Sequence, residues 1–158
     1  MRREHVMLLA VLFLCCQNLS AAVVEVIGGE TSVALDTETL SAAASLDLSG
    51  VSPDVISPGA LPGSVAFAIN SRTAPMLPTT FAYDPADFLG TFSGTIEHSG
   101  SVFFNGDTVE VGNFSINFDA NRAGTLGGNA SGFYVESTTG IAAILFDVAN
   151  PGTLTPTE

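Results

Sequence analysis

The chain has 158 residues, of which 16 are acidic and four are basic, and its formal net charge is −12 at pH 7. It has no lysine, and two of its four arginines stand at positions 2 and 3, so it lacks the clustered basic residues with which proteins bind nucleic acid or an anionic membrane surface. Because 46% of the residues are hydrophobic and only 13% are charged, the composition excludes a disordered acidic chain and predicts a packed core.

The first 22 residues have the three-part pattern of a secretory signal peptide. Arg2 and Arg3 precede the apolar run 6–16, and Ser20-Ala21-Ala22 supplies the small residues that a signal peptidase recognises. This apolar run is too short to span a bilayer, which takes about 20 residues. We therefore expect cleavage after Ala22, secretion of residues 23–158, and no transmembrane helix in the exported chain.

Cleavage changes the chemistry that the chain has available. It leaves 136 of the 158 residues and removes both cysteines and one of the two histidines. The net charge becomes −13, because two arginines and one glutamate leave with the signal peptide. A domain of this size without disulfides depends on its hydrophobic core for stability. We expect one β-rich extracellular domain over residues 23–158.

Residues 23–63 have the least regular pattern of the exported chain. One short helix is predicted over residues 37–46, because the apolar spacing fits a helix and Asp36 is a suitable N-cap. A hairpin is predicted from strands 23–27 and 31–35, which would turn at Gly28-Gly29. Residues 52–63 are predicted to form a proline-rich loop.

From residue 64 on, apolar residues alternate with polar ones, which is the period of a strand with one buried face. Asn105-Gly106 is a strong hairpin signal. The alternation changes phase after Val111, which predicts a bulge at Gly112-Asn113. The predicted strands are 64–70, 88–98, 101–104, 107–111, 114–118, 133–136 and 141–148, with connections at 71–80 and 120–132 and a last turn at 138–140.

These elements predict an all-β, mainly antiparallel fold, which is a sandwich or barrel-like structure of eight to nine short strands with one short helix. Most phenylalanines fall at strand spacing and are expected in the core. Phe114 and Phe118 flank Ile116 on one face. We expect truncation of either phenylalanine to alanine to cost about 3–5 kcal/mol if that face is buried.

The exported chain lacks the residues that most enzymatic mechanisms need. No cysteine remains for nucleophilic catalysis, and a single histidine, His98, cannot complete a usual zinc site. No serine stands in the G-x-S-x-G turn of a hydrolase, since Ser93 has the wrong spacing. We expect His98 to end a strand near solvent and the domain to have no catalytic residue.

Three oxygen-rich turns are the candidates for a metal site, and calcium is the cation that they would suit. They carry Asp84 and Asp87, Asp107, and Asp119 with Asn121. The last begins like an EF-hand loop, but Ala130 stands where the bidentate glutamate belongs. Because Asp, Asn and Gly are the ordinary residues of tight turns, a turn role is favoured over calcium, and no other cofactor is expected.

Carboxylates are the only abundant reactive groups, so a glycan-active hydrolase that uses a carboxylate pair stays open as an alternative. The chain has no tryptophan and only two tyrosines, Tyr83 and Tyr134, to serve as platforms for a sugar. Solvated surface charge is the favoured interpretation of the acidic residues.

The stretch from residue 81 to 150, with GTIEHSG at 94–100 and ILFDV at 144–148, resembles the N-terminal module of exported bacterial proteins of the PEP-CTERM type. The family pattern implies a signal peptide, a β-rich acidic ectodomain, and a C-terminal Pro-Glu-Pro motif with an apolar helix and a basic tail for sorting by exosortase. This chain ends at Glu158 without that helix, which indicates a truncated product or a soluble relative. The resemblance implies no known reaction and no functional residues.

The sequence therefore predicts a secreted, non-enzymatic bacterial domain of the cell surface or the extracellular matrix, which acts by interaction. Its partner would be a surface protein or a polysaccharide. Two alternatives remain: a cation-dependent carbohydrate-binding module, and the hydrolase with paired carboxylates.

Overall fold

The computed structural model describes residues 22–150, so the predicted signal peptide lies almost wholly outside the described residues. The described chain is mostly β, and every strand pair in it is antiparallel. The strands are β1 Val24–Glu25, β2 Glu30–Val33, β3 Leu48–Val51, β4 Val65–Ala68, β5 Ala82–Tyr83, β6 Ile96–Glu97, β7 Ser101–Phe104, β8 Val109–Phe118, β9 Ala130–Gly140 and β10 Ala143–Ala149. The helical segments are α1 Thr37–Ala44, α2 Phe88–Thr91, a 3-10 turn Ala120–Arg122 and α3 Thr125–Gly128.

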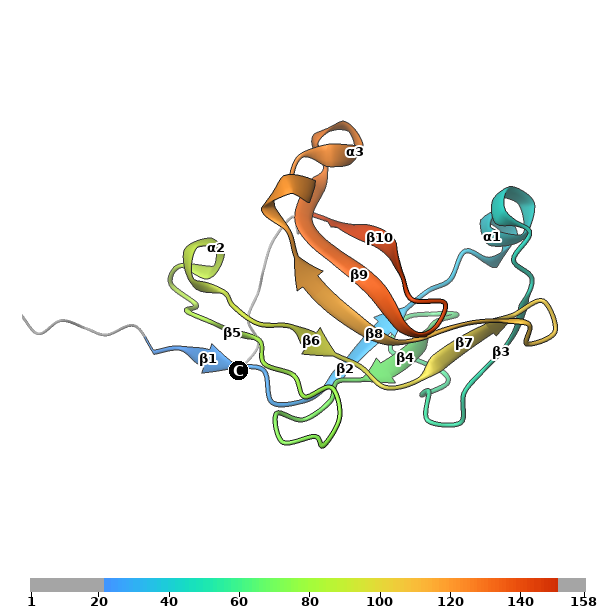
Figure 1. The fold of residues 1–158 in the computed structure, drawn as a ribbon, viewed down its shortest axis with the longest axis horizontal. Coiled ribbons are helices and arrows are strands. Elements are labelled where there is room, and N and C mark those ends of the chain that lie inside the picture. The colour runs from blue at the N-terminus through green and yellow to red at the C-terminus, as the bar shows by residue number, and fades with distance from the viewer. Residues whose placement is uncertain (1–21, 151–158) are drawn as a thin grey trace, which may run out of the picture.

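A six-stranded sheet forms the larger layer. Its order is β10-β9-β8-β7-β3. The short strand β6 pairs with the C-terminal half of β8, and β7 pairs with the N-terminal half of the same strand. The long strands β8, β9 and β10 follow one another as a meander, which Figure 1 shows as the yellow to red ribbons. The sheet does not close into a barrel, so the predicted sandwich-like, all-β fold is confirmed and the barrel-like alternative is wrong.

The second layer is only two strands wide. It consists of β2 and β4, and it packs on the β7 end of the large sheet. The core between the layers is a cluster of four buried apolar side chains, Val55, Phe67, Val102 and Phe104. Partly buried apolar side chains from β2, α1 and β8 pack against this cluster. The narrow second layer leaves β9 and β10 without a facing strand within the described chain.

Helix α1 confirms the one predicted helix. The Asp36 carboxylate accepts a hydrogen bond from the backbone N–H of Thr39, which caps the helix and lowers the pKa of Asp36 below its ordinary value. The helix ends at Ala44, two residues before the predicted end, because Ser45 adopts a left-handed conformation with φ of 54°. The Ser45 N–H then bonds back to the carbonyls of Leu40 and Ser41.

The predicted hairpin of residues 23–27 and 31–35 is wrong. Strand β1 pairs with β5, and β2 pairs with β4, so neither segment pairs with the other. The Gly28-Gly29 step does not make a tight turn. Instead the Gly29 carbonyl accepts a hydrogen bond from Ile69. Each segment thereby joins a more distant strand, and β2 buries its apolar side against the core.

The predicted strand 88–98 is also wrong over its first half. Asp87 caps a single helical turn there, α2, by accepting a hydrogen bond from the Gly90 N–H. Gly94 has a φ of 79° and lies against Thr80, which leaves room for no side chain. Only residues 96–97 are strand β6. The described chain thus has three α-helical segments where one was predicted.

The predicted hairpins of the second half are confirmed. Strands β7 and β8 join at the Asn105-Gly106 turn, and β9 pairs with β10. The predicted turn at 138–140 is wrong in its position, because β9 continues to Gly140 and β10 begins at Ala143. Val111 and Phe114 both pack on the core although they are three residues apart. The strand changes face between them at Asn113, whose φ is 46°. The predicted bulge at Gly112-Asn113 is nevertheless wrong for the β8–β9 pair, because the register continues without a shift from Gly112↔Thr139 to Phe114↔Ser137.

None of the helices in residues 22–150 has the length and apolar character needed to cross a membrane.

Candidate functional site

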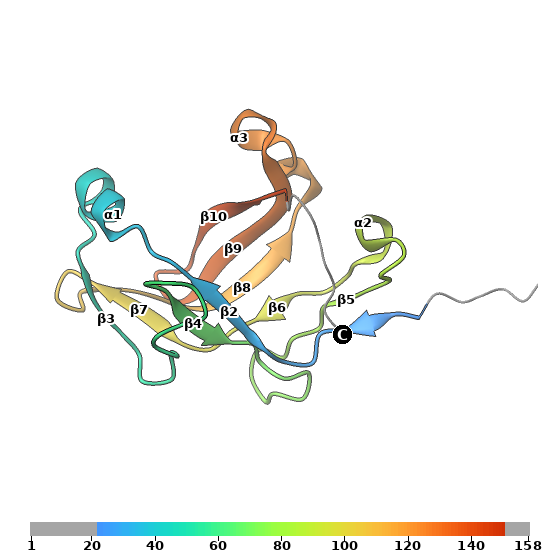
Figure 2. The same cartoon turned by 180° about the vertical axis from the view of Figure 1, so that it is seen from behind.

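A cleft of about 800 Å³ lies between the two layers. Its walls come from β2 and the segment leading to α1 on one side, and from β8, β9 and β10 on the other. Figures 1 and 2 show the β9–β10 hairpin turning away from β2 and α1 on this side of the sheet. The cleft exists because the second layer stops at β2 while the large sheet continues to β10.

The lining of the cleft is almost entirely hydrocarbon. Seventeen of its twenty lining residues are apolar, and the other three are Thr31, Ser32 and His98. No acidic residue, arginine or lysine lines it. The cleft therefore has neither the carboxylate pair of a glycosidase nor the charged groups that would hold a phosphate or a metal ion.

The cleft has a buried floor and an exposed rim. Phe67, Val102 and Phe104 of the core cluster form the floor and are almost fully buried. On the rim, Phe146 of β10 is 49% exposed, and Leu145 and Ile141 are also exposed. Isolated apolar residues on a surface are ordinary, but a contiguous apolar concavity of this kind marks a binding site.

His98 supplies the main polar group in the cleft wall, and it is only 2% exposed. Its Nδ1–H donates to the Phe114 carbonyl oxygen at 3.0 Å, since a carbonyl can only accept. The Nε2 atom of the neutral ring then accepts a hydrogen bond from the Thr31 hydroxyl at 2.7 Å. Both ring nitrogens are thus occupied within the protein.

The expectation that His98 ends a strand near solvent is wrong. The residue follows β6 directly, where its backbone bridges to Ile69 and so ties the large sheet to the end of β4. The side chain is therefore enclosed between the layers. Burial lowers its pKa below the ordinary value, although the Phe114 hydrogen bond and the charge of Glu97 oppose the shift.

The residues proposed for calcium lie in turns outside the cleft. Asp84 accepts from the Ala86 N–H, Asp87 from the Gly90 N–H, and Asp119 from the Asn121 N–H. Asp107 has a φ of 63° in the β7–β8 turn. These groups lie in three separate loops, and no cluster of three or more His, Cys, Asp or Glu side chains occurs between residues 22 and 150.

Sequence reasoning placed the cleft-lining residues in a closed core and so missed the site. One signal was available: Ile144, Leu145 and Phe146 form an unbroken apolar run in a strand that borders the sheet. Such a run puts apolar side chains on both faces, and a sheet edge of this composition needs a cover. Which face lies open depends on the width of the opposite layer, and the pattern does not contain that information.

Comparison with known proteins adds no relationship, because no protein-family model, curated protein or solved structure matches the chain.

Proposed function

We propose that the chain is an exported, non-catalytic binding domain whose cleft takes up an extended apolar small molecule, such as a fatty acyl or isoprenoid chain. The observation that carries this proposal is the size and lining of the cleft. A volume of about 800 Å³ lies in the range of small-molecule sites, and seventeen of twenty lining residues are apolar.

Hydrocarbon burial alone is sufficient for useful affinity. Each buried methylene contributes about 0.8 kcal/mol, so a chain of about 16 carbons gains roughly 12 kcal/mol. Association costs about 4 kcal/mol or more. The balance is at most about 8 kcal/mol, which corresponds to a dissociation constant of about 1 μM or weaker.

A sugar is a poor fit for the same cleft. Carbohydrate hydroxyls need hydrogen-bond partners, and leaving one such group buried without a partner costs about 1–3 kcal/mol. The two ring nitrogens of His98 are already hydrogen-bonded to the Thr31 hydroxyl and to the Phe114 carbonyl, so they are not available to a sugar. A carbohydrate-binding module or a hydrolase would have to use another surface, so the cleft favours the apolar ligand.

Export and a place at the cell surface rest on the N-terminal pattern of residues 1–22 and on the resemblance to PEP-CTERM-type proteins. Recovery of the protein outside the cytoplasm with an N-terminus at Val23 would support this part of the proposal. Recovery there with an intact Met1 would contradict it.

The ligand proposal is tested by titrating the protein with cis-parinaric acid, a fluorescent fatty acid whose emission rises in an apolar site. The matched variants are Phe146→Glu on the cleft rim and Leu89→Glu on α2, where an 80% exposed leucine lies outside the cleft. We expect micromolar binding to the wild type and to Leu89→Glu. Phe146→Glu should bind at least about tenfold more weakly, because a charge on the rim must be desolvated.

Equal affinity of the two variants, or no saturable binding by the wild type, would contradict the proposal. Sedimentation of the same samples measures their oligomeric state and so tests whether a second copy of the chain occupies the cleft. If the wild type dimerises at micromolar concentration and Phe146→Glu is monomeric, a second copy rather than a small molecule covers the cleft.

A further inference from the structure

The face of the large sheet opposite the cleft carries a row of polar side chains. Glu97 of β6 pairs with Ser115 of β8, and Ser115 pairs in turn with Glu136 of β9. Directly paired residues of neighbouring strands project to the same face. The two carboxylates therefore flank the small Ser115 side chain, with no bulky residue between them.

Hydrogen bonds connect the row. The Ser115 hydroxyl donates to Glu97 Oε1 at 2.9 Å, and the Asn117 amide donates to both Ser115 Oγ and Glu136 Oε1 at 3.0 Å. Thr95 Oγ1 also donates to Glu97 Oε1, at 2.6 Å. The cluster thus brings together two carboxylates and two hydroxyls, with the Asn117 amide nitrogen between Ser115 and Glu136.

The Glu97 carboxylate is half satisfied and deeply buried. The residue is only 8% exposed. Its second oxygen, Oε2, is not accessible from the surface and has no hydrogen-bond partner among the described residues. Leaving one oxygen of a buried carboxylate without a partner is costly. This feature separates Glu97 from the turn aspartates Asp84, Asp87 and Asp119, whose carboxylates accept backbone N–H groups.

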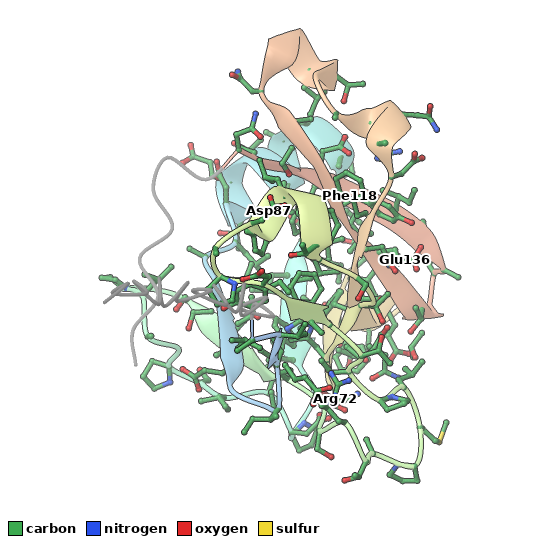
Figure 3. All side chains as sticks on the ribbon, turned by 90° about the vertical axis from the view of Figure 1, so that its left-hand side faces the viewer. Arg72, Asp87, Phe118 and Glu136 are labelled. Atoms are coloured by element: carbon green, nitrogen blue, oxygen red, sulfur yellow. The ribbon has the colours of Figure 1, made fainter. Side chains whose placement is uncertain are left out.

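No positive side chain in residues 22–150 balances this charge. The two arginines of that range form ion pairs elsewhere, Arg72 with Glu25 at 3.2 Å and Arg122 with Asp147 at 2.6 Å. Figure 3 shows Arg72 well separated from Glu136. His98, the next residue in the chain, lies in the cleft wall on the other face of the sheet.

We propose that Glu97 and Glu136, with the hydroxyl oxygens of Ser115 and Thr95, hold a calcium ion against the sheet. Calcium takes six to eight oxygen ligands in flexible geometry, and two carboxylates match its charge. The ion would give Glu97 Oε2 a partner and remove the imbalance of charge. This site is independent of the apolar cleft and of the turns that the sequence suggested.

The test compares thermal unfolding in EDTA and in CaCl2 at constant ionic strength. The variants are Glu97→Gln and, as a matched control, Glu110→Gln, which removes another carboxylate that accepts a serine hydroxyl on this sheet. We expect calcium at about 100 times its dissociation constant to raise the Tm of the wild type and of Glu110→Gln by about 5 °C or more. Calcium should leave the Tm of Glu97→Gln unchanged.

In EDTA, Glu97→Gln should unfold at the same temperature as the wild type or higher, because the amide removes an unbalanced buried charge. If Glu97→Gln does not fold, Glu136→Gln replaces it, and we expect at least about tenfold weaker calcium binding by equilibrium dialysis. A Tm of the wild type that does not respond to calcium would overturn the proposal. An equal calcium response in Glu97→Gln, or an ordered water on Oε2 in a calcium-soaked crystal, would do the same.

Discussion

His98 shows how one residue couples the two layers of the fold. Its ring nitrogens bond to Thr31 of β2 and to the Phe114 carbonyl of β8, and its backbone bridges to Ile69. A protonated ring in this place would carry a charge among hydrocarbon side chains, which is why burial lowers its pKa. The residue is thus a structural link whose stability contribution depends on its being neutral.

Because the folded-state pKa of His98 is lowered, the unfolded chain binds the proton more readily as the pH falls below about 6.5. The stabilisation is present above that pH and is lost as the pH falls through the folded-state pKa. One proton changes the free energy of unfolding by at most about 1.4 kcal/mol per pH unit. We expect urea titrations between pH 7 and pH 5 to show a steeper loss of stability in the wild type than in His98→Gln. Parallel curves for the two proteins would show that His98 does not contribute.

At the scale of the element, β8 passes through two different apolar environments. Phe114 packs edge-on against Phe67 in the core between the layers. Four residues later, Phe118 contacts Phe92 and Phe133 in a second, aromatic cluster beside α2, where it is 39% exposed. Figure 3 shows Phe118 next to α2 and its cap Asp87. The prediction that the face carrying both phenylalanines is buried therefore holds for Phe114 and is wrong for Phe118.

The two alanine variants should accordingly differ in cost. Phe114→Ala removes a core ring and should lower the free energy of unfolding by about 3–5 kcal/mol. Phe118→Ala removes a ring that is already in part exposed, and we expect a loss of about 1–2 kcal/mol. Denaturant titration of both variants measures the difference. Equal losses would mean that the aromatic cluster is packed as tightly as the core.

The elements that sequence reasoning recovered are those whose cause is local. Asn105-Gly106 joins neighbouring strands and Asp36 caps its own helix, so each needs only a few adjacent residues. The pairing of β1 with β5 and of β2 with β4 joins segments about 35 to 60 residues apart. Such pairing depends on which apolar faces remain to be covered, and adjacent residues do not encode it.

At the scale of the whole molecule, the same limit explains why the candidate sites were missed. Alternation in β8, β9 and β10 shows which residues face inward, but the cleft arises because β2 and β4 cover only part of that inner face. The sequence pattern likewise predicts only that Glu97 is a strand residue, because the burial of its side chain and its unpartnered oxygen are properties of the folded chain. Properties that depend on the width of a layer, or on what covers a side chain, belong to the assembled fold.

The border strand β10 gives this fold a liability that can be measured. Its run Ile144, Leu145 and Phe146 is exposed, and a bare apolar edge strand promotes aggregation. Ile144 pairs with Glu136 and does not line the cleft, so Ile144→Thr should slow heat-induced aggregation several-fold and leave cis-parinaric acid binding unchanged. Light scattering during heating checks the first outcome. Leu89→Thr removes a leucine that lies away from the edge and is more exposed, at 80% against 44% for Ile144, and it should aggregate at the wild-type rate. An equal effect of both variants would mean that exposed apolar surface in general, rather than β10, causes the aggregation.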